Sequence, residues 1–162
     1  MSKNTLFASV LVGAALWSSV GFAKEPTVKQ LKAAHTQVAV DGAVLELDAH
    51  LWRDAKPGSP ADEAPLAATI KLKTEGSKRL PVGIHVDRVW VIKGNELWSP
   101  PEHKEEVEAT APGEPPTVVS ILVGNGPKWK PGTKVICVVR ITMSDDSEGL
   151  LKVGGVAISS AP

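Results

Sequence analysis

The chain has 162 residues, and its 18 lysine and arginine residues are balanced by 18 aspartate and glutamate residues. This balance removes the electrostatic basis for binding nucleic acid or an anionic membrane surface. The single cysteine excludes a disulfide framework, and a composition with 43% hydrophobic and 22% charged residues is typical of a globular protein.

Residues 1–23 have the pattern of a secretory signal peptide. Lys3 provides the positive start, residues 6–16 form an uncharged run, and Gly21 and Ala23 are the small residues that a signal peptidase recognises. The alternative is an uncleaved membrane anchor, but the apolar stretch has about 15 residues, whereas a span needs about 20. We therefore expect cleavage after Ala23, export to the periplasm or the medium, and no membrane span in the mature chain.

Removal of residues 1–23 changes the aromatic content, because both phenylalanines lie within them and the chain has no tyrosine. The large aromatic side chains of the mature chain are four tryptophans: Trp52, Trp90, Trp98 and Trp129. We divide the mature chain into a lead-in of residues 24–36 and a single domain of residues 37–162. That length is enough for one domain to bury a core without a covalent staple.

In the first half of this domain, hydrophobic residues alternate with polar ones, which predicts half-buried strands. Residues 44–52 and 66–73 keep this period of two throughout. Residues 82–93 keep it until Arg88 breaks the phase. This break predicts either a β-bulge near Asp87 and Arg88 or a strand that is buried on both faces beyond them.

The middle of the domain combines a hairpin with a polar connection. Gly94-Asn95 is typical of a two-residue turn and leads into a short strand at residues 96–99. Prolines bracket the acidic residues 102–108, which we expect to form a long loop with at most one helical turn. Residues 117–123 are a β-branched run and predict the next strand.

The end of the chain predicts a second hairpin. Residues 134–143 alternate most regularly, and residues 144–149 contain the Ser, Asp and Gly typical of a turn. The return arm begins at residues 150–153 and is interrupted by Gly154-Gly155. Residues 156–159 either extend this arm or form a separate edge strand.

About seven strands without intervening helices predict an all-β fold, an antiparallel two-sheet sandwich. The spacing of the strands, Trp90 in a long third strand, and Pro131-Gly132-Thr133 before a long alternating strand resemble the immunoglobulin-like and fibronectin type III-like sandwiches. The resemblance covers residues 37–159. The chain lacks the paired cysteines and the tyrosine corner of the antibody-type pattern. The resemblance implies the architecture and no particular activity.

Enzyme chemistry finds little support in the sequence. The chain has no Gly-x-Ser-x-Gly elbow, no His-Glu-x-x-His motif and no glycine-rich phosphate loop. Cys137 is in phase with Val135 and Val139, which predicts a buried, unreactive thiol rather than a nucleophile or metal ligand. A cupredoxin-like copper site would need a histidine after the cysteine, and none follows it. We therefore expect no enzyme activity and no cofactor.

Two His/Asp pairs suggest a metal site. In Asp48-Ala49-His50 and His85-Val86-Asp87, residues two apart on a strand point to the same side, here the solvent side. If the two strands were neighbours, Asp48, His50, His85 and Asp87 could bind a divalent ion such as zinc or copper. The alternative is that they lie on two unrelated solvated strand faces.

Three tryptophans, Trp52, Trp98 and Trp129, lie at strand ends or in a loop rather than within an apolar run. Tryptophans in such places can stack on a sugar or form the centre of a protein interface, because they offer a large flat area at low entropic cost. The competing interpretation is that they plug the open ends of the sandwich. Trp90, within the apolar run of residues 89–92, is expected in the core.

Two function hypotheses follow. The first is a non-enzymatic exported module that binds another protein of the bacterial cell envelope or a glycan, or serves as an accessory subunit. The second is an envelope protein that binds zinc or copper through the His/Asp pairs. Neither hypothesis involves nucleic acid as a partner.

Overall fold

The computed structural model describes residues 24–58 and 60–160. The predicted signal peptide at residues 1–23 lies outside the described residues, so its prediction stays untested. The predicted domain begins with strand β1 (Gln37–Val40), and its last two residues, 161 and 162, also lie outside the described range. No helix among the described residues is long and apolar enough to cross a membrane.

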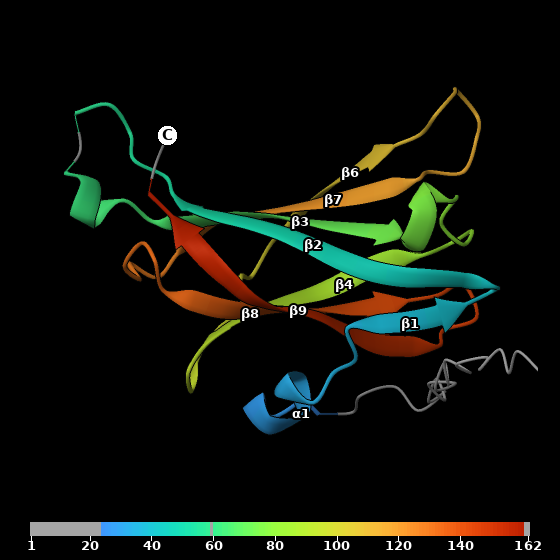
Figure 1. Ribbon diagram of the computed structural model, residues 1–162, viewed down its shortest axis with the longest axis horizontal. Coiled ribbons are helices and arrows are strands. Elements are labelled where there is room, and N and C mark those ends of the chain that lie inside the picture. Colours follow the sequence, from blue (N-terminus) through green and yellow to red (C-terminus); the bar gives the residue numbers. More distant parts are fainter. Residues whose placement is uncertain (1–23, 59, 161–162) are drawn as a thin grey trace, which may run out of the picture.

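The described part of the chain is all-β, as predicted (Figure 1). Apart from β1, its strands are β2 (Ala43–Arg53), β3 (Leu66–Thr74), β4 (His85–Lys93), β5 (Glu96–Trp98), β6 (Lys104–Glu108), β7 (Val118–Gly126), β8 (Lys134–Thr142) and β9 (Glu148–Ser159). The helical elements are α1 (Val28–Lys32) and two single 3₁₀ turns, η1 (Ala61–Glu63) and η2 (Glu75–Ser77).

The nine strands form one continuous, open sheet in the order β5-β4-β8-β9-β2-β3-β7-β6, with β1 paired to β2. All neighbours are antiparallel except β2 and β9. We call β5, β4, β8 and the part of β9 paired to β8 the β4 half, and β1, β2, β3, β7 and β6 the β2 half. One buried cluster includes side chains of both halves, among them Leu51 and Ile70 from one and Val89 and Val139 from the other. We call the sheet face that contributes to this shared core the inner face.

The glycines in β9 explain how the two halves are joined. Val135 pairs with Val156 and Cys137 with Val153, so the residues Gly154 and Gly155 lie opposite one residue of β8. This is the arrangement of a β-bulge, and Gly155 has the positive φ of 67° that glycine adopts without strain. Beyond the bulge, β9 runs parallel to β2. Residues 156–159 therefore extend the arm and lie inside the sheet rather than at its edge.

The phase break in β4 has both of its predicted causes. The register with β8 shifts between Val86 and Arg88, which places a bulge at Asp87. Beyond the bulge the strand is buried on both faces, because Val89 and Val91 point into the shared core while Trp90 and its neighbour Ile92 pack on the outer face. Trp90 is buried as predicted, but in a separate cluster.

That separate cluster forms beneath α1, which the sequence analysis did not predict within the lead-in of residues 24–36. Leu31 of α1 is fully buried against Trp90, Ile92 and Val138. Figure 1 shows α1 below β8 and β9. A capping box begins the helix: the Thr27 hydroxyl accepts from the Gln30 N–H, and the Gln30 side chain accepts from the Thr27 N–H. Five residues are too few to show a helical period, so the capping box was the available signal.

The prediction of a loop at residues 102–108 was wrong for most of this segment, because residues 104–108 form β6 at the edge of the sheet. β6 pairs along its whole length with β7, and Val107 is 66% exposed. Glutamate-rich segments do not favour strands by propensity, so pairing with β7 decides the structure here. Charged side chains on an edge strand discourage pairing with other chains.

Candidate functional site

The alternation of β2 places His50 and Trp52 together on the outer face of the sheet. Leu51 and Arg53, in the opposite phase, are buried. The two rings stack along the strand with their centroids 5.3 Å apart and their planes 21° from parallel. His50 is exposed and Trp52 is half-buried, so this pair presents aromatic surface to solvent.

Neighbouring strands complete a depression around this pair. In the register of the sheet, Thr69 of β3 lies opposite His50, and Ser159 of β9 lies beside Trp52. These four residues and Ser160 line the depression. The site therefore depends on three strands from distant parts of the sequence, and on the point where β9 crosses to β2.

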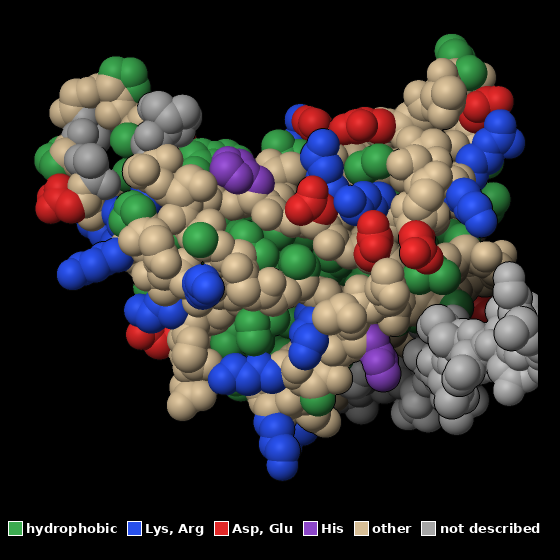
Figure 2. All heavy atoms as spheres, in the orientation of Figure 1, with side chains coloured by type: hydrophobic (Ala, Val, Ile, Leu, Met, Phe, Trp, Pro, Cys, Tyr) green, Lys and Arg blue, Asp and Glu red, His purple; other side chains and the backbone are tan. Residues whose placement is uncertain are grey.

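The rest of this outer face carries paired charges. Lys73 of β3 lies 3.6 Å from the Glu46 carboxylate on β2, and Lys71 lies 3.9 Å from the Glu108 carboxylate on β6. Figure 2 shows acidic and basic side chains interspersed over the strands of the β2 half. Such exposed pairs contribute little to stability. Because each pair combines a positive and a negative group, the face has no strong electrostatic potential of one sign. The aromatic depression differs from this surrounding surface in both shape and chemistry.

The predicted metal site does not form, because its two pairs lie in different halves of the sheet. Asp48 and His50 are on β2, and His85 and Asp87 are on β4, with β9 and β8 between them in the strand order. The Asp87 carboxylate instead accepts a hydrogen bond of 2.6 Å from Arg140 Nε. Among the described residues, no group of three or more His, Cys, Asp or Glu side chains is arranged to hold a metal ion.

Trp129 belongs to the structure of the fold rather than to an exposed platform. Its ring is 7% exposed and is part of the shared core. Its Nε1 donates to the Glu96 carboxylate at 2.8 Å, and the Lys93 ammonium lies 5.4 Å from the ring centroid. Hydrogen bonds from Lys93 and from Trp129 lower the pKa of Glu96. The burial of Trp129 therefore favours its interpretation as a plug.

Trp98 packs in a similar way at the same end of the molecule. It is half-buried, and its ring lies so close to Gly126 that a Cβ atom there would be 2.7 Å from the indole. A glycine at this position is therefore required for the ring to pack. Trp98 and Trp129 line a common groove, whereas Trp52 lines the depression on the outer face. The three predicted tryptophans do not form one surface.

Arg53 is a structural residue that the sequence analysis missed. Its side chain is buried and donates to three backbone carbonyls: Nη1 to Trp129 at 2.9 Å, Nη2 to Asp62 at 2.7 Å, and Nε to Ala64. A buried guanidinium is stable only when its donors are satisfied. Arg53 thus fixes the end of β2 to two loops. Its inward phase, shared with Leu51, was the signal for burial.

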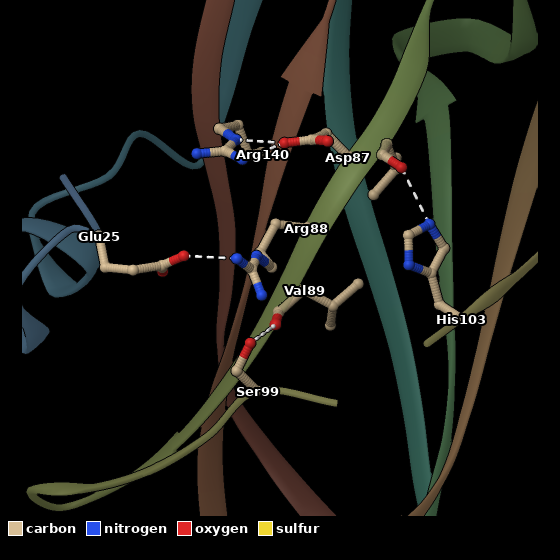
Figure 3. Close-up of polar contacts among 8 residues, drawn as sticks. Glu25, Asp87, Arg88, Val89, Ser99, His103 and Arg140 are labelled. Atoms are coloured by element: carbon tan, nitrogen blue, oxygen red, sulfur yellow. Dashed lines mark hydrogen bonds and ion pairs between the residues drawn. The ribbon is translucent and has the colours of Figure 1, made fainter. Parts of the chain in front are cut away.

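A polar cluster surrounds the bulge of β4 (Figure 3). Arg140 bonds to Asp87, and Arg88 bonds to Glu25 at 2.5 Å. Arg140 also lies 5.9 Å from the centroid of the Trp90 ring. Each guanidinium in the cluster therefore already has a carboxylate partner, and the cluster ties the N-terminal segment to β4.

Side chains of the segment after β5 provide hydrogen-bond partners for backbone groups at the open edge of β4. His103 Nε2 donates to the Val86 carbonyl at 2.9 Å (Figure 3). The Val86 N–H donates to the Glu105 carboxylate at 3.1 Å. The Ser99 hydroxyl donates to the Val89 carbonyl at 3.1 Å. These bonds take the place of a neighbouring strand, so an edge that would otherwise invite pairing is covered.

Cys137 is fully buried in the shared core, which confirms the prediction of a core thiol. Burial raises the pKa of the thiol from 9.0 to about 12. The thiol is therefore protonated at neutral pH, and a protonated, inaccessible thiol is neither a nucleophile nor a metal ligand.

Comparison of the chain with protein-family models and with curated proteins finds no match. The outer-face depression is therefore argued from its own geometry. The sequence indicated His50 and Trp52 as candidates for separate reasons, but it did not indicate Thr69, Ser159 and Ser160. The outward phase of the first two was visible in the alternation of residues 44–52, whereas the other three depend on register between distant strands.

Proposed function

We propose that the protein is an exported, non-enzymatic binding module of the bacterial cell envelope that holds its ligand on the outer face of the β2 half. The observation that supports this most directly is the stacked pair of His50 and Trp52 in a depression. The signal peptide pattern of residues 1–23 is the basis for export.

The architecture in this proposal is an immunoglobulin-like sandwich whose two layers are the β4 half and the β2 half. A core shared by both halves supports it, as does a last strand that pairs first with one half and then with the other. Such modules use loops and sheet faces for binding on a rigid scaffold.

The position of Trp52 supports a role in binding rather than in folding. The shared core takes the opposite phase of β2, so a smaller or polar residue at position 52 would leave that core unchanged. Tryptophan is among the side chains that contribute most to binding energy, because it buries a large area with few rotatable bonds. Strands on both sides of β2 hold its backbone in place, which limits the ordering cost of binding.

Co-sedimentation with cell-envelope fractions of the source organism tests this proposal. We expect the wild-type protein to sediment with one fraction in a saturable manner and Trp52→Ala to lose most of that binding. Lys73→Ala, a change on the same face outside the depression, is the matched control and should bind like the wild type. Equal binding by folded Trp52→Ala would overturn the proposal.

A further inference from the structure

We infer that the ligand at the His50–Trp52 depression is a neutral saccharide, with one pyranose ring packed against the aromatic pair. This inference rests on the proposed function and names the ligand class for the same site.

The lining combines aromatic surface with hydroxyl groups. His50 and Trp52 contribute two stacked rings, and the other three lining residues, Thr69, Ser159 and Ser160, have hydroxyl side chains. A hydroxyl both donates and accepts hydrogen bonds. A pyranose ring has the complementary chemistry, because an apolar face of C–H groups is bordered by hydroxyls.

The charge of the lining argues for an uncharged ligand. The five described residues that line the depression include no carboxylate, lysine or arginine. Lys73 and Lys71 on the same face are close to carboxylates of Glu46 and Glu108, so an anionic polymer would have to compete with existing ion pairs. An acidic glycan or a charged peptide is therefore less suited to this site than a neutral sugar.

The site is held in place before any ligand arrives. His50 and Thr69 are antiparallel partners in the β2–β3 pair, and Trp52 and Ser159 are parallel partners in the β2–β9 pair. Groups fixed on strands are positioned more accurately than groups on loops, which lowers the entropic cost of binding. We expect this single open site to bind weakly, with a Kd on the order of 1 mM.

A titration with neutral tetrasaccharides, followed by tryptophan fluorescence and calorimetry, tests the inference. The probes are the tetramers of glucose in β-1,4 and α-1,4 linkage and of N-acetylglucosamine. Each is added to the mature chain, residues 24–162. We expect at least one to bind saturably. Trp52→Ala should lower its affinity about tenfold or more, as expected when the main stacking surface is lost.

A conservative variant protects the test against misfolding. Thr69→Val keeps the shape of the side chain while removing its hydroxyl. A second variant, His50→Ala at an exposed position, removes the imidazole ring of the stack. Both should lower affinity by a few fold, and Lys73→Ala should leave it unchanged. No saturable binding of any tetrasaccharide by the wild type, or equal binding by Trp52→Ala, Thr69→Val and the wild type, would overturn the inference.

The two proposals fail in different ways. If no tetrasaccharide binds while envelope binding still depends on Trp52, the saccharide inference is wrong and the proposed function stands. If binding to the envelope is also independent of Trp52, both are wrong. Competition of the bound tetrasaccharide against envelope binding would support both, because the same site would then serve both ligands.

Discussion

On the outer face of the β4 half, Trp90 and Ile92 lie beneath Leu31 of α1, whereas on the outer face of the β2 half, His50 and Trp52 reach solvent. The two faces belong to one sheet and share one core on their inner sides. The difference between the two faces is therefore whether another element of the chain covers their aromatic residues. Trp90 needs a cover to be stable, while Trp52 is left half-buried in a depression that a ligand can enter.

The strand patterns account for this difference. Residues 89–92 of β4 are all apolar, so both faces of that strand must be buried, and the short segment before β1 supplies the second cover. Outward residues of β2 and β3 are mostly polar or charged, so their face needs no cover. A helix of five residues is sufficient because it has to cover only the patch around Trp90 and Ile92.

Removal of the cover should have the largest effect on stability. Leu31→Ala deletes a fully buried side chain between α1 and the β4 half, and we expect it to lower the free energy of unfolding by about 3 kcal/mol. Urea denaturation followed by circular dichroism measures this change. Lys29→Ala, an exposed position on the same helix, should have almost no effect; equal effects of the two would contradict a covering role for α1.

Weakening the start of the helix should have an intermediate effect. Thr27→Ala removes the hydroxyl that accepts from the Gln30 N–H, and loss of such a cap costs about 1 kcal/mol. Thr27→Ser keeps the acceptor and should restore most of the stability in the same urea experiment. If serine and alanine at this position behave alike, the capping box does not hold α1 in place.

Changes to the open face should have the smallest effect on stability. Lys73→Ala removes a partly exposed ion pair with Glu46, and we expect a loss of about 0.5 kcal/mol or less. The loss should shrink further at 1 M salt, because salt screens exposed pairs. A loss as large as that of Leu31→Ala would show that this face is not independent of the core.

The reactivity of the Cys137 thiol should show that loss of the contact between α1 and the β4 half leaves the shared core closed. Its thiol points into the shared core, whereas Val138, the next residue of β8, points toward α1. In Leu31→Ala under native conditions, we therefore expect reaction with a thiol reagent at pH 8 to stay as slow as in the wild type. Rapid labelling of the variant, without urea, would mean that the core opens together with the cover.

The sequence predicted the elements of this fold better than it predicted their partners. The alternation in β2 and β3 and the phase break in β4 follow from periods of two, which are local. β6 was missed because its strand state comes from pairing with β7, and α1 was missed because five residues show no period. These elements depend on tertiary contacts more than on local preference.

The candidate site likewise combines features that local periodicity predicts with features that depend on tertiary contacts. The outward directions of His50 and Trp52 could be predicted, because alternation fixes the face of each residue. The metal hypothesis failed because it needed β2 and β4 to be neighbours, and strand order depends on long-range pairing. The places of Thr69 and Ser159 beside the rings also depend on register between strands distant in sequence.

Mapping of backbone chemical shifts during titration with the neutral tetrasaccharides locates binding on one of the two outer faces. We expect saturable shifts of the amides of His50, Trp52, Thr69 and Ser159, with α1 and β4 unchanged. Saturable shifts centred on α1 and β4, or on the groove beside Trp98, would contradict it, as would the absence of any shift.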